Sequence, residues 1–259
     1  MKIRFVELTS IMMLLSSCQP AVVTTIPQPT QPPAQPTQPS SEVAPGISLD
    51  YSTVANNVTI ETVAAQPGTA EGPYWKAAPQ YRLLTLEGYP VANSLRKPQI
   101  FIYPAGDLAN ANQNMGNIAT DLQVLLQTKQ TGVQLPFLPL LSKAQALHAQ
   151  VQFLNIKNGN GVRFLTQLTQ GMTLINNSEL FYTFQGMTSD GNYYIAAILP
   201  VSNPELSTDF NVSGEQSNTQ DDYRTYLSNA ITLLNEQPAN AYTPDLDILD
   251  ALIRSIEIK

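Results

Sequence analysis

Residues 148–201 constrain the fold more than any other stretch, because they hold four short apolar runs separated by turn-forming residues. The first two runs flank residues 157–161, where two Asn-Gly steps supply the positive φ that a tight hairpin requires. The last two runs flank residues 188–191, which end in glycine. This pattern predicts an antiparallel meander of four strands.

Alternation of side chains along these strands predicts two apolar faces. With Met187 opposite Asn192, one face carries Leu180, Tyr182, Phe184, Tyr193, Ile195, Ala197 and Leu199, and the other carries Phe181, Thr183, Gln185, Tyr194, Ala196 and Ile198. A sheet with two apolar faces needs cover on both sides. The candidate binding residues here are Tyr182, Tyr193 and Tyr194, which can form a platform that stacks on a ligand. Strands favour aromatic residues for packing alone, and packing is the role that we expect.

The sequence on either side of the meander adds strands and helices. Apolar runs bounded by proline or glycine predict strands within residues 47–54, 57–65, 81–89 and 99–104. Helical spacing of apolar residues predicts a helix over 106–128 with Asp107 at its start, and helices that begin at Thr219 and at Thr243-Pro244. We therefore predict an α+β fold, in which about three helices cover a predominantly antiparallel sheet of about seven strands.

Two loops before the meander have unusual compositions. Residues 135–141 read LPFLPLL, which predicts either a crossover buried over the sheet or an exposed patch for a partner. We expect burial. Trp75 follows Tyr74, and the pair can bind a sugar or cover the end of a sheet, which is the more common arrangement.

The scarcity of cysteine and histidine excludes several kinds of chemistry. The chain has one cysteine, Cys18, and one histidine, His148, so it has no disulfide framework, no thiolate cluster and no histidine-rich metal site. No metal and no cofactor are predicted. A net charge of -7 without a cluster of Lys and Arg argues against nucleic acid as a partner.

The first residues have the composition of a secretory signal. Lys2 and Arg4 precede a short apolar stretch that is too short to span a bilayer. Leu15-Ser16-Ser17-Cys18 resembles the lipobox of bacterial lipoproteins. The resemblance implies that residues 1–17 are removed and that Cys18 carries diacylglyceryl, with acyl chains such as palmitate. It places the protein on the extracytoplasmic side of the cell membrane, or at the outer membrane where the host has one. The alternative is an ordinary signal peptide with an unmodified cysteine.

Residues 18–45 are predicted to be a tether, because repeated proline, glutamine and threonine cannot pack a core. Fully extended as polyproline II, such a segment spans roughly 80 Å. A Pro-rich run can also be a ligand for SH3-type domains, but outside the cytoplasm a spacer is expected. Residues 46–259 are then a single globular domain.

Charged residues offer few candidate sites. Arg163, inside the meander, either clamps an anionic ligand or satisfies Glu179 or a backbone carbonyl, and we expect the second. Glu87, Glu179 and Asp190 are carboxylates of the type that hydrolases use in pairs, but their spacing selects none of them.

Two further arrangements have simpler explanations. Asp245, Asp247 and Asp250 resemble the start of a calcium loop but lack its glycine and closing glutamate, so we expect them to complement a helix N-terminus, with Asp250 paired to Arg254. His148 has no serine elbow near it in the sequence, and packing is expected instead of a catalytic triad.

The order of strands, helix, meander and C-terminal helix, ending in the segment LIRSIEI, loosely resembles Mog1/PsbP-like α/β/α sandwiches. The resemblance implies a binding or assembly module. We therefore predict a lipid-anchored, non-catalytic module that binds a protein or polymer of the cell envelope. The alternative is a surface hydrolase that uses a carboxylate pair.

Overall fold

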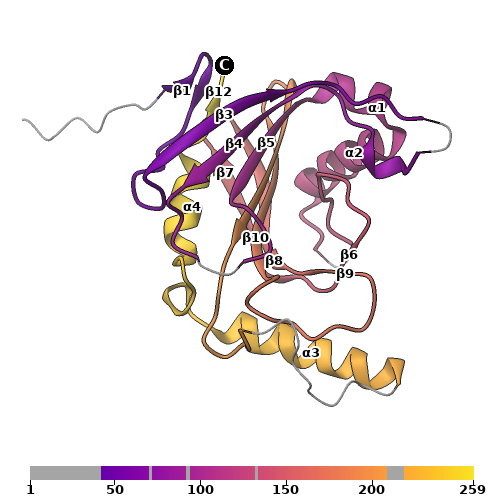
Figure 1. Ribbon diagram of the computed structural model, residues 1–259, viewed down its shortest axis with the longest axis vertical. Helices are drawn as coiled ribbons and strands as arrows, with labels where there is room; N and C mark the ends of the chain where they lie inside the picture. Colours follow the sequence, from indigo (N-terminus) through magenta and orange to yellow (C-terminus); the bar gives the residue numbers. More distant parts are fainter. Residues whose placement is uncertain (1–41, 70–71, 92–93, 132–133, 209–218) are drawn as a thin grey trace, which may run out of the picture. The chain divides into compact units, whose positions relative to one another are not determined.

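The computed structural model describes residues 42–69, 72–91, 94–131, 134–208 and 219–259. Residues Ser40–Lys259 form one compact unit around a seven-stranded antiparallel sheet with the order β3-β4-β5-β11-β10-β8-β7 (Figure 1). This confirms the predicted α+β class. The predicted signal peptide, Cys18 and the predicted tether up to residue 41 lie outside the described residues. The seven strands are β3 Asn57–Val63, β4 Tyr81–Glu87, β5 Gln99–Pro104, β7 Ala149–Ile156, β8 Gly159–Thr166, β10 Phe181–Thr188 and β11 Tyr193–Pro200.

Smaller elements surround this sheet. β1 (Glu42–Ala44), β2 (Ile47–Ser48) and β12 (Glu257–Ile258) form a three-stranded sheet, and β6 (Ala144–Gln145) pairs with β9 (Leu168–Thr169). β1 thus precedes the predicted start of the domain at residue 46. The helices are α1 Leu108–Ala111, α2 Gln113–Thr128, α3 Gln220–Glu236 and α4 Leu246–Arg254, with 3-10 turns η1 Tyr74–Lys76, η2 Ala105–Asp107 and η3 Ala239–Ala241.

The meander is confirmed, with β7, β8, β10 and β11 as consecutive neighbours in the sheet. The predicted register was wrong, because Met187 lies opposite Tyr194 and not opposite Asn192. The error is an even number of residues, and side chains alternate with a period of two. The two predicted faces therefore keep the same members.

The first hairpin turns at Lys157 and Asn158, before the glycines that were expected to form it. Gly159 and Gly161 belong to β8 and have no positive φ. A Cβ at Gly161 would collide with the ring of Phe184 and with the carbonyl of Gln185, so this glycine permits close approach of β10. In the second turn, Gly191 has the expected positive φ of 73°.

Both faces of the sheet are covered, as predicted. On the face called here the α4 face, α3 and α4 pack over residues that include Tyr182, Phe184 and Ile195. On the opposite α2 face, α2 and the segment 135–138 cover residues that include Phe181 and Tyr194. Figure 1 shows α2 and α4 on opposite sides of the strands.

The loop 135–141 is buried over the α2 face at Leu135, Pro136 and Leu138, as expected, while its other four residues are half-buried. Leu135 and Leu138 are 1% and 0% exposed. The Leu138 N–H donates to Gln185 Oε1 at 2.9 Å, and Gln185 Nε2 donates to the Leu138 carbonyl at 3.1 Å. A side chain from the middle of β10 thus replaces the hydrogen bonds that the loop backbone loses on burial.

Two of the three predicted helix starts are correct in position, and one of them has the expected side-chain cap bond. Thr219 caps α3 by accepting from the Asp222 N–H at 3.1 Å. Asp107 stands at the N-cap position of α1, as predicted, but its side chain makes no cap bond, and the helix predicted over 106–128 breaks at Asn112, which caps α2. Asp245, and not Thr243, caps α4.

The predicted strand over 47–54 is confirmed only at Ile47–Ser48. Beyond it, the Asp50 N–H donates to Ser255 Oγ at 2.8 Å, and the backbone turns at residues 52–54. This bond joins the start of the domain to the end of α4. The Asp50 N–H is therefore bonded to a side chain and not to a neighbouring strand.

Candidate functional site

A hollow on the α2 face runs between α2 and residues 134–145. It consists of two adjoining pockets of about 480 and 390 Å³, which share Asp121, Gln134 and Pro136. We call this hollow the α2 groove. Its apolar lining comprises Tyr74, Ile118, Val124, Leu125, Leu135, Pro136, Phe137, Pro139, Leu140 and Leu141. Polar side chains, among them Asp121, Gln134, Lys143 and Gln145, share this lining, and polar groups that converge beside apolar contacts are typical of a binding site.

Exposed aromatic residues border the groove. Tyr74 is 56% exposed and lines it, and Trp75, which is 36% exposed, packs edge-on against Tyr74 at 5.2 Å. The turn η1 that carries both is held by Asn112, whose Nδ2 donates to the Tyr74 carbonyl at 2.6 Å. The residue that caps α2 therefore also positions the aromatic pair.

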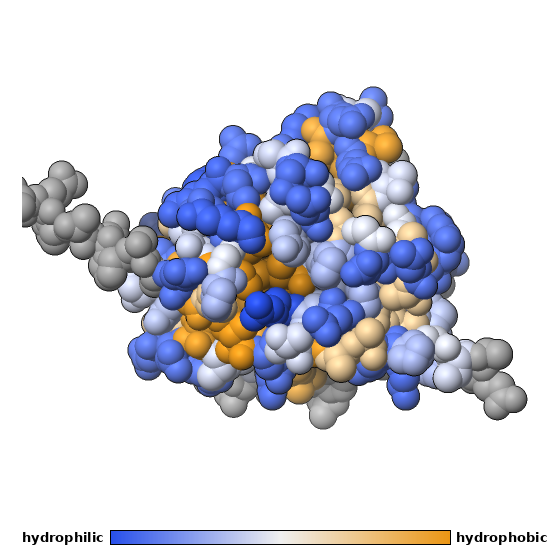
Figure 2. Space-filling model, turned by 90° about the horizontal axis from the view of Figure 1, so that it is seen from above, coloured by the Kyte–Doolittle hydropathy of each residue, from blue (hydrophilic) through white to orange (hydrophobic). Residues whose placement is uncertain are grey.

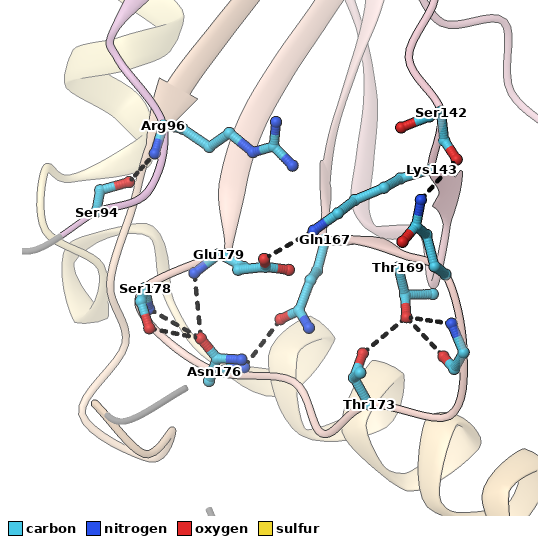
Figure 3. Close-up of polar contacts among 12 residues, drawn as sticks. Ser94, Arg96, Ser142, Lys143, Gln167, Thr169, Thr173, Asn176, Ser178 and Glu179 are labelled. Atoms are coloured by element: carbon cyan, nitrogen blue, oxygen red, sulfur yellow. Dashed lines mark hydrogen bonds and ion pairs between the residues drawn. The ribbon is translucent and has the colours of Figure 1, made fainter. Parts of the chain in front are cut away.

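A charged cluster also borders the groove. Lys143 lines the groove, and its Nζ lies 3.1 Å from Oε1 of Glu179, whose side chain is 4% exposed. Arg96 extends over the same cluster (Figure 3). Its guanidinium carbon lies 5.9 Å from the centre of the Phe181 ring, and Phe181 in turn contacts Phe137 of the groove. Two cations thus accompany one buried carboxylate.

Glu179 is held in place by the loop that precedes β10. Asn176 Oδ1 accepts hydrogen bonds from the Glu179 N–H at 3.1 Å and from the Ser178 hydroxyl at 2.9 Å. The Asn176 N–H donates to Oε1 of the buried Gln167 at 3.0 Å. Figure 3 shows these bonds linking the loop to the end of β8. The loop is therefore fixed from inside, and Glu179 has one defined position.

Arg96 has spare hydrogen-bonding capacity. Its Nε is buried without a hydrogen-bond partner, and its guanidinium forms no ion pair within the part of the chain that the structure describes. Lys143 is already paired with Glu179. The charged cluster beside the groove therefore attracts an anionic group on a ligand.

Comparison with protein-family models, with curated proteins and with solved structures found no match. The resemblances to lipoproteins and to Mog1/PsbP-like sandwiches stay predictions. Among the described residues, no helix is long and apolar enough to cross a membrane.

Arg163 and Tyr182 lie on the opposite side of the sheet from the groove, where they surround the buried Asp250. Arg163 Nε lies 3.3 Å from Asp250 Oδ1, and the Tyr182 hydroxyl donates to the same oxygen at 2.9 Å. Arg163 also donates to the backbone carbonyl of Gln150, as expected, and to Gln152 Oε1 at 2.7 Å. Glu179, the other expected partner, pairs with Lys143 instead.

The two remaining predicted tyrosines lie apart. The Tyr194 hydroxyl donates to Gln185 Oε1 at 2.7 Å in the interior of the α2 face. Burial raises the pKa of Tyr194 well above its usual value. Tyr193 is half-buried and lines a separate pocket near β12. The structure therefore does not bring Tyr182, Tyr193 and Tyr194 to one surface, and their role in binding stays a prediction.

The carboxylates considered for hydrolysis are also separated. Glu179 and Asp190 lie beyond opposite ends of β10, and Glu87 ends β4. The buried Asp250 is on the α4 face, and each buried carboxylate faces a cation. Asp250 also pairs with Arg254 at 3.7 Å, as predicted. Within the described residues, no group of three or more His, Cys, Asp or Glu could hold a metal ion.

His148 packs edge-on against Phe164 at 5.3 Å, and its Nε2 lies 3.0 Å from Gln145 Oε1. Burial lowers its pKa. This is the packing role that the sequence suggested.

Sequence reasoning missed Arg96, Lys143 and the pairing of Glu179. Only 13% of the residues are charged. A charge directly beside an apolar run is therefore conspicuous, as Glu179 is before Leu180. That signal indicates a buried charge but not its partner, which comes from a distant part of the chain.

Proposed function

We propose that this protein is a lipoprotein, anchored by lipid on Cys18 to the extracytoplasmic side of the cell membrane. We also propose that its domain is a non-catalytic module that binds a protein or polymer of the cell envelope. The lipobox and the Pro-rich tether support the first part. The α2 groove, which is lined by both the exposed Tyr74 and Lys143 of the charged cluster, is the observation that carries the second part.

The chemistry of the groove suits an extended chain. The prolines and Phe137 provide an apolar floor, while Asp121, Gln134 and Gln145 provide polar groups along it. Exposed aromatic rings add contact area at a small cost in conformational entropy. Arg96 and Lys143 favour a ligand segment that bears an acidic group. A segment of an envelope protein or polymer has these properties.

The lipid anchor is tested by replacing the modified cysteine. Cells that express the natural chain, Cys18→Ala or the control Ser10→Ala are labelled with radioactive palmitate and fractionated. The natural chain and S10A are expected to carry label and to sediment with membranes, and C18A to do neither. Membrane-bound, unlabelled natural protein would overturn the proposed anchor.

Binding is tested with the groove altered at exposed positions. Protein-free wall polymer and solubilised envelope proteins are incubated in parallel with the natural chain, Tyr74→Ala or Trp75→Ala. The control is Ile248→Ala on α4, where Ile248 is 37% exposed, close to the 36% of Trp75. Retention that falls at least fivefold in both groove variants but not in I248A is expected. Equal retention of all four proteins would contradict the groove as the binding site.

A further inference from the structure

A second, smaller hollow lies between the main sheet and the three-stranded sheet. It measures about 180 Å³. Three adjacent strands of the main sheet contribute Arg82, Ile102 and Tyr193, which share a face because Arg82 pairs with Ile102 and Tyr193 with Pro104. The small sheet contributes Ile47 and Ile258. In the view of Figure 2, a hollow shows hydrophobic residues around a strongly hydrophilic one.

Arg82 is the notable residue in this hollow. It is half-buried, and within the described residues its side chain forms neither an ion pair nor a hydrogen bond. Lys259, which also lines the hollow, pairs with Glu257 at 3.4 Å. The guanidinium therefore has five N–H donors free for a ligand. Its apolar surroundings strengthen the attraction to an anion relative to open water.

The size of the hollow limits the ligand. An apolar cavity of about 150 Å³ accepts a benzene ring. A hollow of about 180 Å³ therefore accepts a ring-sized apolar body with a small head group. A carboxylate or phosphate head group presents two oxygens to the fork of an arginine.

We propose that the hollow formed by Arg82, Tyr193 and the isoleucines Ile47, Ile102 and Ile258 binds a small amphiphilic anion, with its carboxylate or phosphate on Arg82 and its apolar body between the two sheets. Tyr193, a binding candidate from the sequence, flanks the site with a hydroxyl group. The site is separate from the α2 groove and does not depend on the function proposed for that groove.

The test uses the full chain carrying Cys18→Ala with isotope-labelled isoleucine methyl groups. Benzoate and phenyl phosphate are titrated separately, which distinguishes the two head groups, and benzyl alcohol is the neutral control. Saturable shifts of the methyl signals of Ile47, Ile102 and Ile258 are expected with at least one anion. Benzyl alcohol is expected to bind at least tenfold more weakly.

Variants of Arg82 test whether its positive charge binds the anion. Arg82→Met is expected to weaken anion binding at least tenfold and Arg82→Lys by less, while Arg224→Met, at an exposed arginine on α3, leaves it unchanged. The spectra of the three variants report whether each remains folded. If R82M does not fold, R82K and the alcohol comparison decide. The proposal is overturned if the three methyl signals do not shift, if the alcohol binds as tightly as the anions, or if folded R82M binds as tightly as the natural side chain.

Discussion

At the scale of single residues, Asp250 is a carboxylate held away from water and bordered by Arg163, Tyr182 and Arg254. Burial raises the pKa of Asp250, and the nearby Arg163 guanidinium and the Tyr182 hydroxyl lower it by less. A raised pKa in the folded state means that ionisation of Asp250 opposes folding, and that this opposition fades as the pH falls through that pKa. The ion pair therefore does not by itself make the fold stable.

Replacing one member of this pair should be more harmful than replacing both. Arg163→Met leaves the Asp250 carboxylate buried without its closest cation and should lower the free energy of unfolding by about 3–5 kcal/mol. The double variant Arg163→Met/Asp250→Leu should recover most of that loss. Denaturant unfolding measures both values.

The matched control for this prediction is Arg224→Met, because Arg224 pairs with Asp221 at 3.2 Å on the surface, with side chains 69% and 89% exposed. Arg224→Met should lower the free energy of unfolding by less than about 1 kcal/mol. A double variant no more stable than R163M would show that the pair is a net source of stability.

The stability of the protein should depend on pH through His148. The effect can be assigned to this residue, since it is the single histidine of the chain. Burial lowers its pKa, so the unfolded chain binds the proton more readily than the folded one. The contribution of neutral His148 to stability is complete above about pH 6.5 and declines as the pH falls below that value.

The change predicted to remove this dependence is His148→Gln. The difference in unfolding free energy between the natural chain and H148Q should shift against the natural chain between about pH 7 and 5. Proton NMR of the single imidazole gives its pKa directly. An imidazole pKa above about 6.5 would contradict the prediction.

At the scale of secondary-structure elements, the approach of β8 to β10 depends on glycine. The ring of Phe184 lies where side chains at Gly161 and Gly186 would otherwise project. Gly161→Ala should cost about 1–3 kcal/mol, because the added methyl group meets both this ring and the backbone of Gln185. Gly171→Ala is the control, since nothing lies within 4 Å of its Cβ position, and thermal unfolding compares the two.

The start of α2 gives a second test at this scale. Asn112→Ala should destabilise the protein by about 1 kcal/mol or more, because Asn112 caps the helix and also holds the carbonyl of Tyr74. Asp107→Ala should have an effect below about 0.5 kcal/mol, since Asp107 makes no cap bond. Equal effects in chemical denaturation would mean that the cap was assigned to the wrong residue.

At the scale of the whole molecule, the described part of the compact unit begins with β1 at Glu42. A chain that starts at residue 40 should therefore melt within about 2 °C of the full chain. A chain that starts at residue 49 lacks β1 and β2, leaves β12 without its partner, and should melt more than about 4 °C lower. Calorimetry measures the melting temperatures of the three chains. Equal melting temperatures would show that the small sheet adds no stability.

The sequence allowed the sheet, its two faces and the helices to be predicted, because each depends on the spacing of neighbouring residues. The predicted faces of β10 are correct although the predicted register was wrong, because alternation of side chains alone determines the faces. The α2 groove could not be predicted in this way. It forms where α2 meets residues 134–145, and the pairing of Lys143 with Glu179 depends on how distant segments meet.

The hydrogen bond between Asp50 and Ser255 joins positions that stand 205 residues apart. Ribosomes make the earlier position long before the later one, so β2 remains without β12 during most of synthesis. Closing so long a loop is an entropic cost that falls late in folding. Until then the edge of β2 that pairs with β12 stays open, so the growing chain carries an unpaired strand edge until its last residues are added.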